Sequence, residues 1–323
     1  MHPIKMTPAY RYGEMTPWGG SALRDVFHKD IPDERTGESL EVSVLPGLES
    51  RAGDGRTLTQ ILQEGGQDVR GTDVGEEFPL LLKLISARER LSVQVHPDDA
   101  YARQHEGGKL GKTEAWVILD CKPGAELVYG IRAGVTREDL RAACAAGGKA
   151  VEDCLRRLPV QPGDVVYIPA GMVHAIGEGI LLLEIQQSSD VTYRFWDWGR
   201  LDANGNPRAL HVEKGLDVVD VSLQLEPCRG ERVRATGGER IRYIQDKNFV
   251  LERLKVKGSM PLEVMPRRFR LLTALCDGYL TEEGFALRFR PGDSIFIPAS
   301  AGRVKLECEG DLLLCSPGEA CAR

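Results

Sequence analysis

The sequence has no long apolar run, no dense basic cluster and no closely spaced pair of cysteines. The longest apolar runs, such as residues 115–119, are far too short to span a bilayer, so we expect no membrane partner. The densest basic stretch, residues 267–270, is short and the formal net charge is -6, which argues against nucleic-acid binding. Residues 1–6 lack the apolar core of a secretion signal, and we expect a cytoplasmic protein.

Cysteine usage agrees with that expectation. Eight cysteines are scattered along the 323 residues, and no two of them form a Cys-x-x-Cys pair. Several, such as Cys144 and Cys154, lie among apolar residues. We therefore expect reduced and mostly buried thiols rather than a disulfide framework.

The composition that remains is that of an ordinary globular protein, with 42% hydrophobic and 28% charged residues. Many short strand-like segments, for example residues 165–168 and 180–185, are separated by Gly, Pro or Ser. This pattern predicts a mainly β fold, a sandwich or barrel rather than a doubly wound sheet. Residues 136–158 instead have helical apolar spacing, which Gly147 and Gly148 divide into two helices.

One nine-residue segment occurs twice. Pro162–Ala170 reads Pro-Gly-Asp-Val-Val-Tyr-Ile-Pro-Ala, and Pro291–Ala299 reads Pro-Gly-Asp-Ser-Ile-Phe-Ile-Pro-Ala. The repeat suggests two related β units. The first copy runs on to His174, whereas the matching position of the second copy is Arg303. If a site needs that histidine, the second unit has lost it and is structural.

The most informative stretch is Leu91–Asp99, Leu-Ser-Val-Gln-Val-His-Pro-Asp-Asp. Its alternation places the three apolar residues on one strand face and Ser92, Gln94 and His96 on the other. The polar face either meets water or points into a site as metal ligands. Asp98 and Asp99 are expected only to cap and begin a short helix.

Two later residues bear on that choice. Glu114 opens a strand and His174 follows a turn between two strands. Taken singly, Glu114 is typical of an edge charge and His174 of a hydrogen-bonded core residue. Together with Gln94 and His96, they offer the imidazole, carboxylate and amide donors that suit a borderline divalent ion.

Four motifs in the chain resemble those of type I mannose-6-phosphate isomerases, in their short bacterial form. They are Leu91–Asp99, Gly111-Lys-Thr-Glu-Ala-Trp116, Tyr167-Ile-Pro-Ala-Gly-Met-Val-His-Ala-Ile176 and Glu184-Ile-Gln-Gln-Ser-Ser-Asp-Val-Thr-Tyr-Arg194. The resemblance covers most of the chain and is weakest in the last hundred residues. It implies a cupin jelly-roll β-sandwich, with the metal-binding catalytic domain in residues 1–225 and a helical insertion around 136–158. It also implies a second, degenerate cupin unit in residues 226–323.

The resemblance further implies the reaction and the metal. The family interconverts mannose 6-phosphate and fructose 6-phosphate through a metal-stabilised enediol, so the expected partner is a small sugar phosphate. Its zinc ligands fall on Gln94, His96, Glu114 and His174, although another divalent metal is possible. Its active-site arginine falls on Arg194, which suits an electrostatic clamp better than a base. The oligomeric state stays open between monomer and homodimer.

The acid and base stay open as well. Lys112 lies two residues before Glu114, and it is either a proton-transferring group or a solvated loop lysine. Glu184 and Asp190 belong to the family motif after His174, and Asp190 alone would suit an Asx turn. These three residues are the further catalytic candidates.

Substrate contacts are predicted at three positions. The candidates for phosphate contacts are Ser92, which shares the face of Gln94 and His96, and Lys83, which lies inside an otherwise apolar strand. That lysine either extends outward to water or pairs inward with an anion such as phosphate. Trp18 either walls the sugar site or is a buried core residue.

Two other functions remain as alternatives. A non-catalytic cupin that binds a sugar phosphate, or regulates by interaction, would not need Gln94, His96, Glu114, His174 and Arg194 together. An iron-dependent cupin enzyme would require a closely spaced histidine pair on one strand, where this chain has Gln94 in the first position.

Overall fold

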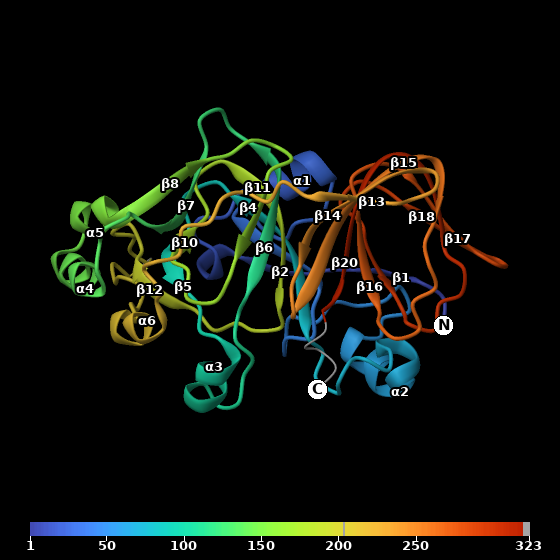
Figure 1. The fold of residues 1–323 in the computed structure, drawn as a ribbon, viewed down its shortest axis with the longest axis horizontal. Helices are drawn as coiled ribbons and strands as arrows, with labels where there is room; N and C mark the ends of the chain where they lie inside the picture. The colour runs from blue at the N-terminus through green and yellow to red at the C-terminus, as the bar shows by residue number, and fades with distance from the viewer. Residues whose placement is uncertain (203, 319–323) are drawn as a thin grey trace.

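The computed structural model describes residues 1–202 and 204–318. It is mainly β, as predicted. Its strands form three sheets that follow one another from left to right in Figure 1, each packed against the next. In the described part, no helix is long and apolar enough to cross a membrane. The seven described cysteines are all free, but the expectation that most are buried was wrong, because only Cys154, Cys308 and Cys315 are buried and the other four, Cys144 among them, are partly exposed. Cys321 lies outside the described residues.

The central sheet has six strands. In sheet order they are β2 (Ala9–Tyr12), β3 (Thr36–Val42), β4 (Leu80–Ala87), β11 (Ile180–Gln187), β6 (Glu114–Cys121) and β9 (Val165–Ile168). Between β2 and β3 the chain forms a 3-10 turn, Gly13–Met15, and helix α1 (Ala22–Phe27).

The second sheet has five strands and packs against the central one. In sheet order they are β12 (Tyr193–Trp196), β5 (Val93–Val95), β10 (His174–Ala175), β7 (Glu126–Ile131) and β8 (Leu155–Pro159). Large side chains from both sheets fill the space between them, among them Ile85, Trp116 and Tyr129. The two sheets therefore enclose one apolar interior.

Helices cover the outer face of the five-stranded sheet (Figure 1). They are α4 (Arg137–Ala146), α5 (Lys149–Cys154) and α6 (Val212–Val218), while α3 (Asp99–His105) follows β5. Val93 and Val95 pack in this outer layer, as the alternation of Leu91–Asp99 predicted. Asp98 accepts a hydrogen bond from the backbone N–H of Tyr101 and caps α3, also as predicted.

The third sheet is formed mainly by the C-terminal part of the chain. Its main path is β1 (Ile4–Met6), β19 (Ser294–Ile297), β16 (Arg270–Ala274), β20 (Lys305–Pro317), β15 (Phe249–Pro261), β14 (Gly238–Gln245) and β13 (Glu231–Val233). The hairpin of β17 (Gly278–Glu282) and β18 (Phe285–Phe289) pairs with β20. We call residues 226–318 the C-terminal unit.

The C-terminal unit packs through one face of its sheet onto the central sheet. Their shared core joins residues such as Leu82 and Val117 of the central sheet to Leu251, Leu271 and Phe296 of the C-terminal unit. The other face of the C-terminal sheet encloses a separate apolar cluster. Each unit thus has its own interior, and a common apolar layer lies between them.

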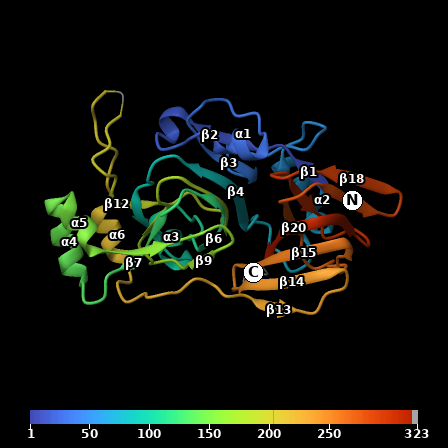
Figure 2. The same ribbon diagram turned by 90° about the horizontal axis from the view of Figure 1, so that it is seen from above.

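Two segments from the start of the chain belong spatially to the C-terminal unit (Figure 2). Strand β1 pairs with β19, with Lys5 opposite Ile295. Helix α2 (Leu58–Arg70) contributes Leu58, Ile61 and Leu62 to the shared core, at three- and four-residue spacing. Its regular helical geometry stops at Gly66, which has a non-helical φ of 51°, and a second helical segment follows this kink.

The sequence pattern predicts that the helical insertion ends at residue 158, which is too late. Helices occupy Arg137–Ala146 and Lys149–Cys154, but residues 155–158 lie in strand β8. Leu155 and Leu158 pair with Ile131 and Leu127 of β7. Their three-residue spacing fits a helix, but the open edge of β7 takes them up as a strand, a contact that local spacing does not reveal.

Candidate functional site

Three of the predicted site residues lie side by side because of strand pairing. Gln94 of β5 stands opposite His174 of β10 on one side and opposite Arg194 of β12 on the other. Paired residues of neighbouring strands point to the same face of a sheet. The five-stranded sheet therefore presents this row toward the central sheet, where Glu114 begins β6.

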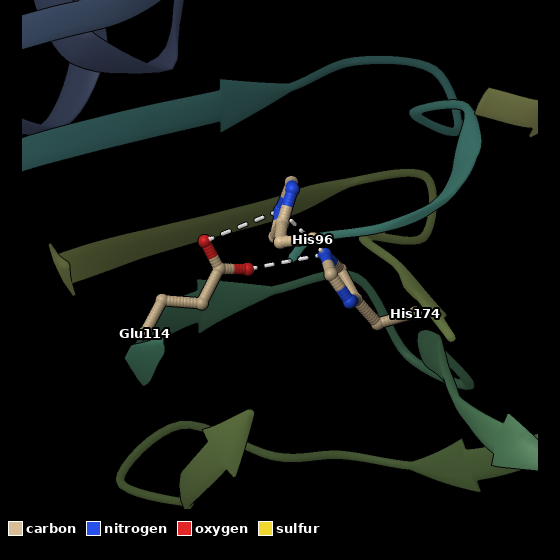
Figure 3. A group of neighbouring side chains, drawn as sticks. All are labelled: His96, Glu114 and His174. Carbon is tan, nitrogen blue, oxygen red and sulfur yellow. Dashed lines mark hydrogen bonds and ion pairs between the residues drawn. The ribbon is translucent and has the colours of Figure 1, made fainter. Parts of the chain in front are cut away.

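His96, Glu114 and His174 converge on one point, each offering one donor atom within 4.8 Å of the others (Figure 3). The Nε2 atom of His174 lies 3.1 Å from Oε1 of Glu114 and 3.2 Å from Nε2 of His96. The Nε2 atom of His96 lies 3.7 Å from Oε2 of Glu114. All three side chains are at most 1% exposed.

The protonation of this cluster suits a cation. His174 is oriented by a 2.8 Å contact between its Nδ1 and the carbonyl oxygen of Met172, which leaves Nε2 with its lone pair toward the cluster. Burial and the nearby Lys112 hold the pKa of His96 well below its usual value, so this imidazole is neutral. Although burial opposes it, Lys112 and the histidines hold the pKa of Glu114 well below its usual value.

Gln94 completes the donor set. Its amide nitrogen lies 3.3 Å from Nε2 of His174, and its amide oxygen lies 3.5 Å from the hydroxyl of Ser92. A half-turn of the amide would direct the oxygen to the same point as the imidazoles and the carboxylate. Two neutral imidazoles, one carboxylate and one amide therefore fit a divalent metal ion, with room for exogenous ligands.

A chain of buried charges leads away from Glu114. Lys112 lies 2.9 Å from Glu114 and 3.6 Å from Glu184, measured from its Nζ to their carboxylate oxygens. Lys83 in turn lies 3.4 Å from Glu184 and 3.7 Å from Glu38. Lys112 and Lys83 are only 7% and 5% exposed, so both lysines point inward rather than to water.

These contacts shift two pKa values in the same direction. Burial, reinforced by Glu114, raises the pKa of Glu184 to about 7, although both lysines oppose the shift. Glu114 and Glu184 outweigh burial and raise the pKa of Lys112. The Lys112–Glu184 ion pair thus lies directly beside the candidate metal-ligand cluster.

Both groups border a cavity of about 130 Å³, which we call the N-terminal cavity. Trp18 and Ser92 also line it and are nearly fully buried, at 4% and 3% exposed. Trp18 is held closely by Gly37, where a Cβ would lie 2.6 Å from the indole ring. Trp18 is thus both a buried residue and a wall of the cavity.

Arginines gather at one side of the N-terminal cavity. Arg194 and Arg208 both line it, and Arg208 lies 3.6 Å from the buried carboxylate of Asp197. Arg200 shares that carboxylate at 3.5 Å. Burial and the nearby charge of Arg208 lower the pKa of Arg194. Among the described residues, Nε of Arg194 and one terminal nitrogen of Arg208 have no hydrogen-bond partner.

The predicted residues thus share one cavity wall, apart from the two histidines in the cluster behind it. Asp190 lies at the rim, where it pairs with the exposed Lys109 at 2.7 Å. The predicted helix-start residue Asp99 has an additional contact, because its carboxylate accepts hydrogen bonds from Gly111 and Gln187. It thereby fixes the loop that leads to Lys112.

Sequence reasoning missed Glu38 and Arg208. Glu38 lies in β3 opposite Ile85 and pairs with both Lys83 and Arg11. In the sequence Glu38 lies two residues from the apolar Leu40, so it shares a strand face with an apolar residue. That spacing indicates a buried carboxylate only once the partner strand is known. Arg208 lies after β12 in a turn-rich segment, with no local pattern to mark it.

Comparisons with known proteins agree with this geometry. Residues 6–114 match the family model "Phosphomannose isomerase type I, catalytic domain". The chain is 35% identical over 321 residues to the Bacillus subtilis protein named "Probable mannose-6-phosphate isomerase GmuF", covering 98% of this chain and 99% of that one. It is 38% identical over 295 residues to "Mannose-6-phosphate isomerase ManA" of the same organism, covering 90% of this chain and 92% of that one.

A solved structure gives the same result. The crystal structure of mannose 6-phosphate isomerase from Bacillus subtilis superimposes with a TM-score of 0.90 at 34% identity. It covers 98% of this chain and 99% of that chain, so the likeness includes the C-terminal unit.

Proposed function

The chain belongs to the type I mannose-6-phosphate isomerases, and from this membership we propose that it interconverts mannose 6-phosphate and fructose 6-phosphate. The observation that carries the proposal is the N-terminal cavity, which brings a metal-ligand cluster, a buried lysine–carboxylate pair and two arginines together. In the isomerisation of a sugar phosphate these three kinds of group can act on the oxygens, the proton and the phosphate of the substrate.

We propose that Gln94, His96, Glu114 and His174 hold Zn2+. Such an ion supplies Lewis-acid polarisation of the substrate oxygens. Glu114 is the one anionic residue among the four proposed ligands, because histidine binds a metal through neutral imidazole and the amide is uncharged. A bound dication therefore leaves the site with net positive charge, which suits a substrate that becomes more anionic during reaction.

Arg194 and Arg208 are proposed to bind the phosphate. They are two guanidinium groups beside the carboxylate of Asp197, with unpaired N–H donors at the N-terminal cavity. Guanidinium groups match phosphate oxygens in a bidentate geometry. Lys83 is already paired with two carboxylates, so it serves better to hold Glu184 in place than to bind phosphate.

The isomerisation moves a proton between C2 and C1 through an enediol, and we assign this transfer to Lys112 and Glu184. Their side chains lie 3.6 Å apart, both border the N-terminal cavity, and Lys112 also contacts Glu114. Ser92 is placed to meet a substrate hydroxyl, and Trp18 to cover a face of the sugar. Asp190 is more than a third exposed and paired with Lys109, which suits a rim residue.

A coupled assay with mannose 6-phosphate tests the reaction, before and after chelation and after return of Zn2+. We expect fructose 6-phosphate to form, activity to be lost on chelation and activity to return with the metal. Formation of no product by the metal-loaded protein would favour a sugar-phosphate binding protein instead. Reconstitution by Fe2+ but not by Zn2+ would favour an iron enzyme.

Two further properties complete the proposal. A cytoplasmic location fits the substrate, since phosphorylated sugars are intracellular metabolites. The chain is proposed to act as a monomer or a homodimer, which light scattering of the purified protein distinguishes directly.

A further inference from the structure

The C-terminal unit repeats the strand order of the central sheet. The order β2-β3-β4-β11-β6-β9 corresponds to β13-β14-β15-β20-β16-β19. The sequence repeat fixes the register, because Ile168 and Ile297 occupy the same position within Pro162–Ala170 and Pro291–Ala299. Glu114 pairs with Ile168 in the central sheet, and Arg270 pairs with Ile297 in the C-terminal sheet. Arg270 therefore stands where the central sheet has the metal-ligand carboxylate.

The same correspondence continues across the sheet. In the central sheet Glu184 pairs with Lys83 of β4. Two residues further along β4, Ile85 pairs with Glu38. In the C-terminal sheet the matching pairs are Leu314 with Glu252 and Leu254 with Arg240. The acid Glu38 thus corresponds to Arg240, and the base Lys83 corresponds to Glu252.

At these matched positions the side chains of the C-terminal unit therefore carry charges opposite to those of the central sheet. Two carboxylates are replaced by arginines, one lysine by a carboxylate, and Arg303 holds the position that the repeat aligns with His174. The C-terminal unit also lacks counterparts of β5 and α3, since the short loop 262–269 joins β15 to β16. A cation site is thereby excluded, and the space above the sheet is left open.

That space is a cavity of about 830 Å³, which we call the C-terminal cavity. Five cationic side chains line it together with a single carboxylate, Glu263. The cations are Arg234, Arg240, Arg270, Arg303 and Lys305. Apolar side chains such as Leu254, Met260 and Leu262 form the rest of the lining.

Arg270 is the buried centre of this group, with only 3% of its surface exposed. One of its terminal nitrogens donates to the carbonyl oxygen of Glu263 at 2.7 Å, while its Nε has no partner among the described residues. Burial and the charge of Arg240 lower its pKa to about 10 against the attraction of Glu263, so it remains charged at neutral pH. A buried cation without a carboxylate in contact is costly unless an anion completes it.

The neighbouring cations do not all have internal partners. Arg240 is held by the buried carboxylate of Glu252 at 2.7 Å, and Lys305 pairs with Glu307 at 2.8 Å. By contrast, no ion pair within residues 1–202 and 204–318 involves Arg234, Arg270 or Arg303. Arg270 is thus a buried charge without an ion-pair partner, and the exposed Arg234 and Arg303 add two unpaired charges around the same cavity. A dianion neutralises such a group better than a single carboxylate.

We propose that the C-terminal cavity binds a small molecule that carries a phosphate group. The arginines hold the phosphate near Arg270, and the apolar lining accommodates the organic part of the ligand. This binding site is separate from the N-terminal cavity and takes no part in the isomerisation.

Calorimetry with pyrophosphate as the probe tests the site in the metal-loaded enzyme. An Arg194→Ala, Arg208→Ala background removes the proposed phosphate contacts of the N-terminal cavity, and the part of the remaining binding that depends on Arg270 reports the C-terminal cavity. We expect pyrophosphate to bind this background, and its affinity to fall at least about 10-fold on adding Arg270→Gln, because a charged hydrogen bond is lost. Complete loss of binding in the background itself would overturn the proposal, as would unchanged affinity after Arg270→Gln.

Substitutions at exposed positions provide a second test in case the Arg270→Gln variant does not fold. Arg303→Glu lies at the surface of the cavity and is expected to weaken binding similarly, whereas Arg288→Glu on β18, outside the cavity, is expected to leave it unchanged. Tighter binding of succinate than of pyrophosphate would overturn the assignment to phosphate. In the otherwise wild-type enzyme, Arg270→Gln should retain isomerase turnover, which separates a failure of this site from a failure of the proposed reaction.

Discussion

In the N-terminal cavity, carboxylates and lysines alternate along matched strands, whereas in the C-terminal cavity arginines hold the places of two of those carboxylates. The strand order and register are the same in both sheets. The backbone pairing therefore fixes where side chains point but not what they bind. The presence of β5 and β10 in only one unit decides which interior can complete a metal site, since these strands carry Gln94 and His174.

The difference between the two cavities is tested most directly by substitutions at the matched positions Glu114 and Arg270. Glu114→Gln removes the one carboxylate among the proposed metal ligands, and we expect metal affinity to fall by more than about 100-fold, because even residues that only support the ligands are worth about 10–100-fold. Turnover should fall to background. Metal analysis after dialysis and the coupled assay measure both effects, and Arg270→Gln is the matched control that should keep metal and turnover. Full metal content with unchanged turnover in Glu114→Gln would refute the role of this carboxylate.

The next effect separates proton transfer from metal binding. Lys112→Ala is expected to lower kcat by about 100- to 10,000-fold, the usual range for a positioned acid or base, while most of the metal is retained. The exposed Lys122, which pairs with Glu178, provides the control variant Lys122→Ala with unchanged kcat. If Lys112→Ala turns over normally with full metal content, Lys112 has no place in the mechanism.

Arginines in the two cavities should differ in their effect on substrate. Arg194→Ala and Arg208→Ala are each expected to raise KM for mannose 6-phosphate by about 10- to 100-fold, because each removes a charged hydrogen bond to phosphate. Arg303→Ala, in the C-terminal cavity, should leave KM unchanged. Steady-state kinetics with varied substrate measure these values, and an unchanged KM in both N-terminal variants would place the phosphate elsewhere.

The smallest effect on activity is expected at Glu252, the counterpart of Lys83. Glu252→Gln leaves Arg240 and Arg242 without their shared carboxylate, and we expect the free energy of unfolding to fall by about 2 kcal/mol, with turnover retained. Denaturant unfolding gives the first quantity. Lys83→Met is the matched variant, and it should lower turnover because Glu184 loses one of its two lysine partners. A loss of turnover in Glu252→Gln at full stability would contradict the separation of the two interiors.

The sequence predicted best where a pattern is local. The period-two alternation of Leu91–Asp99 placed Val93 and Val95 in the outer layer, and the cap preference of Asp98 located the start of α3. Motif positions brought Gln94, His96, Glu114 and His174 into one hypothesis, and the structure brings them together, although their roles remain predictions.

What local patterns missed depends on partners far along the chain. The role of Glu38 is evident only from its ion pair with Lys83 on the neighbouring strand β4. Strand β8 forms because it can pair with the open edge of β7. The sequence repeat aligned Arg303 with His174, but its nine matched residues begin only after the strands that carry Arg240 and Arg270. The inverted charge of the second interior therefore required the register of the whole sheet.

Strand β1 has a consequence for the order in which the molecule is assembled. Lys5 is translated well before its partner Ile295, which follows 290 residues later in the sequence. At about 5–20 residues per second, the edge of β1 waits roughly 15–60 s for β19 to leave the ribosome. Any fusion or extension that restrains the first residues therefore acts on closure of the last sheet, a late event, rather than on folding of the segment to which it is attached.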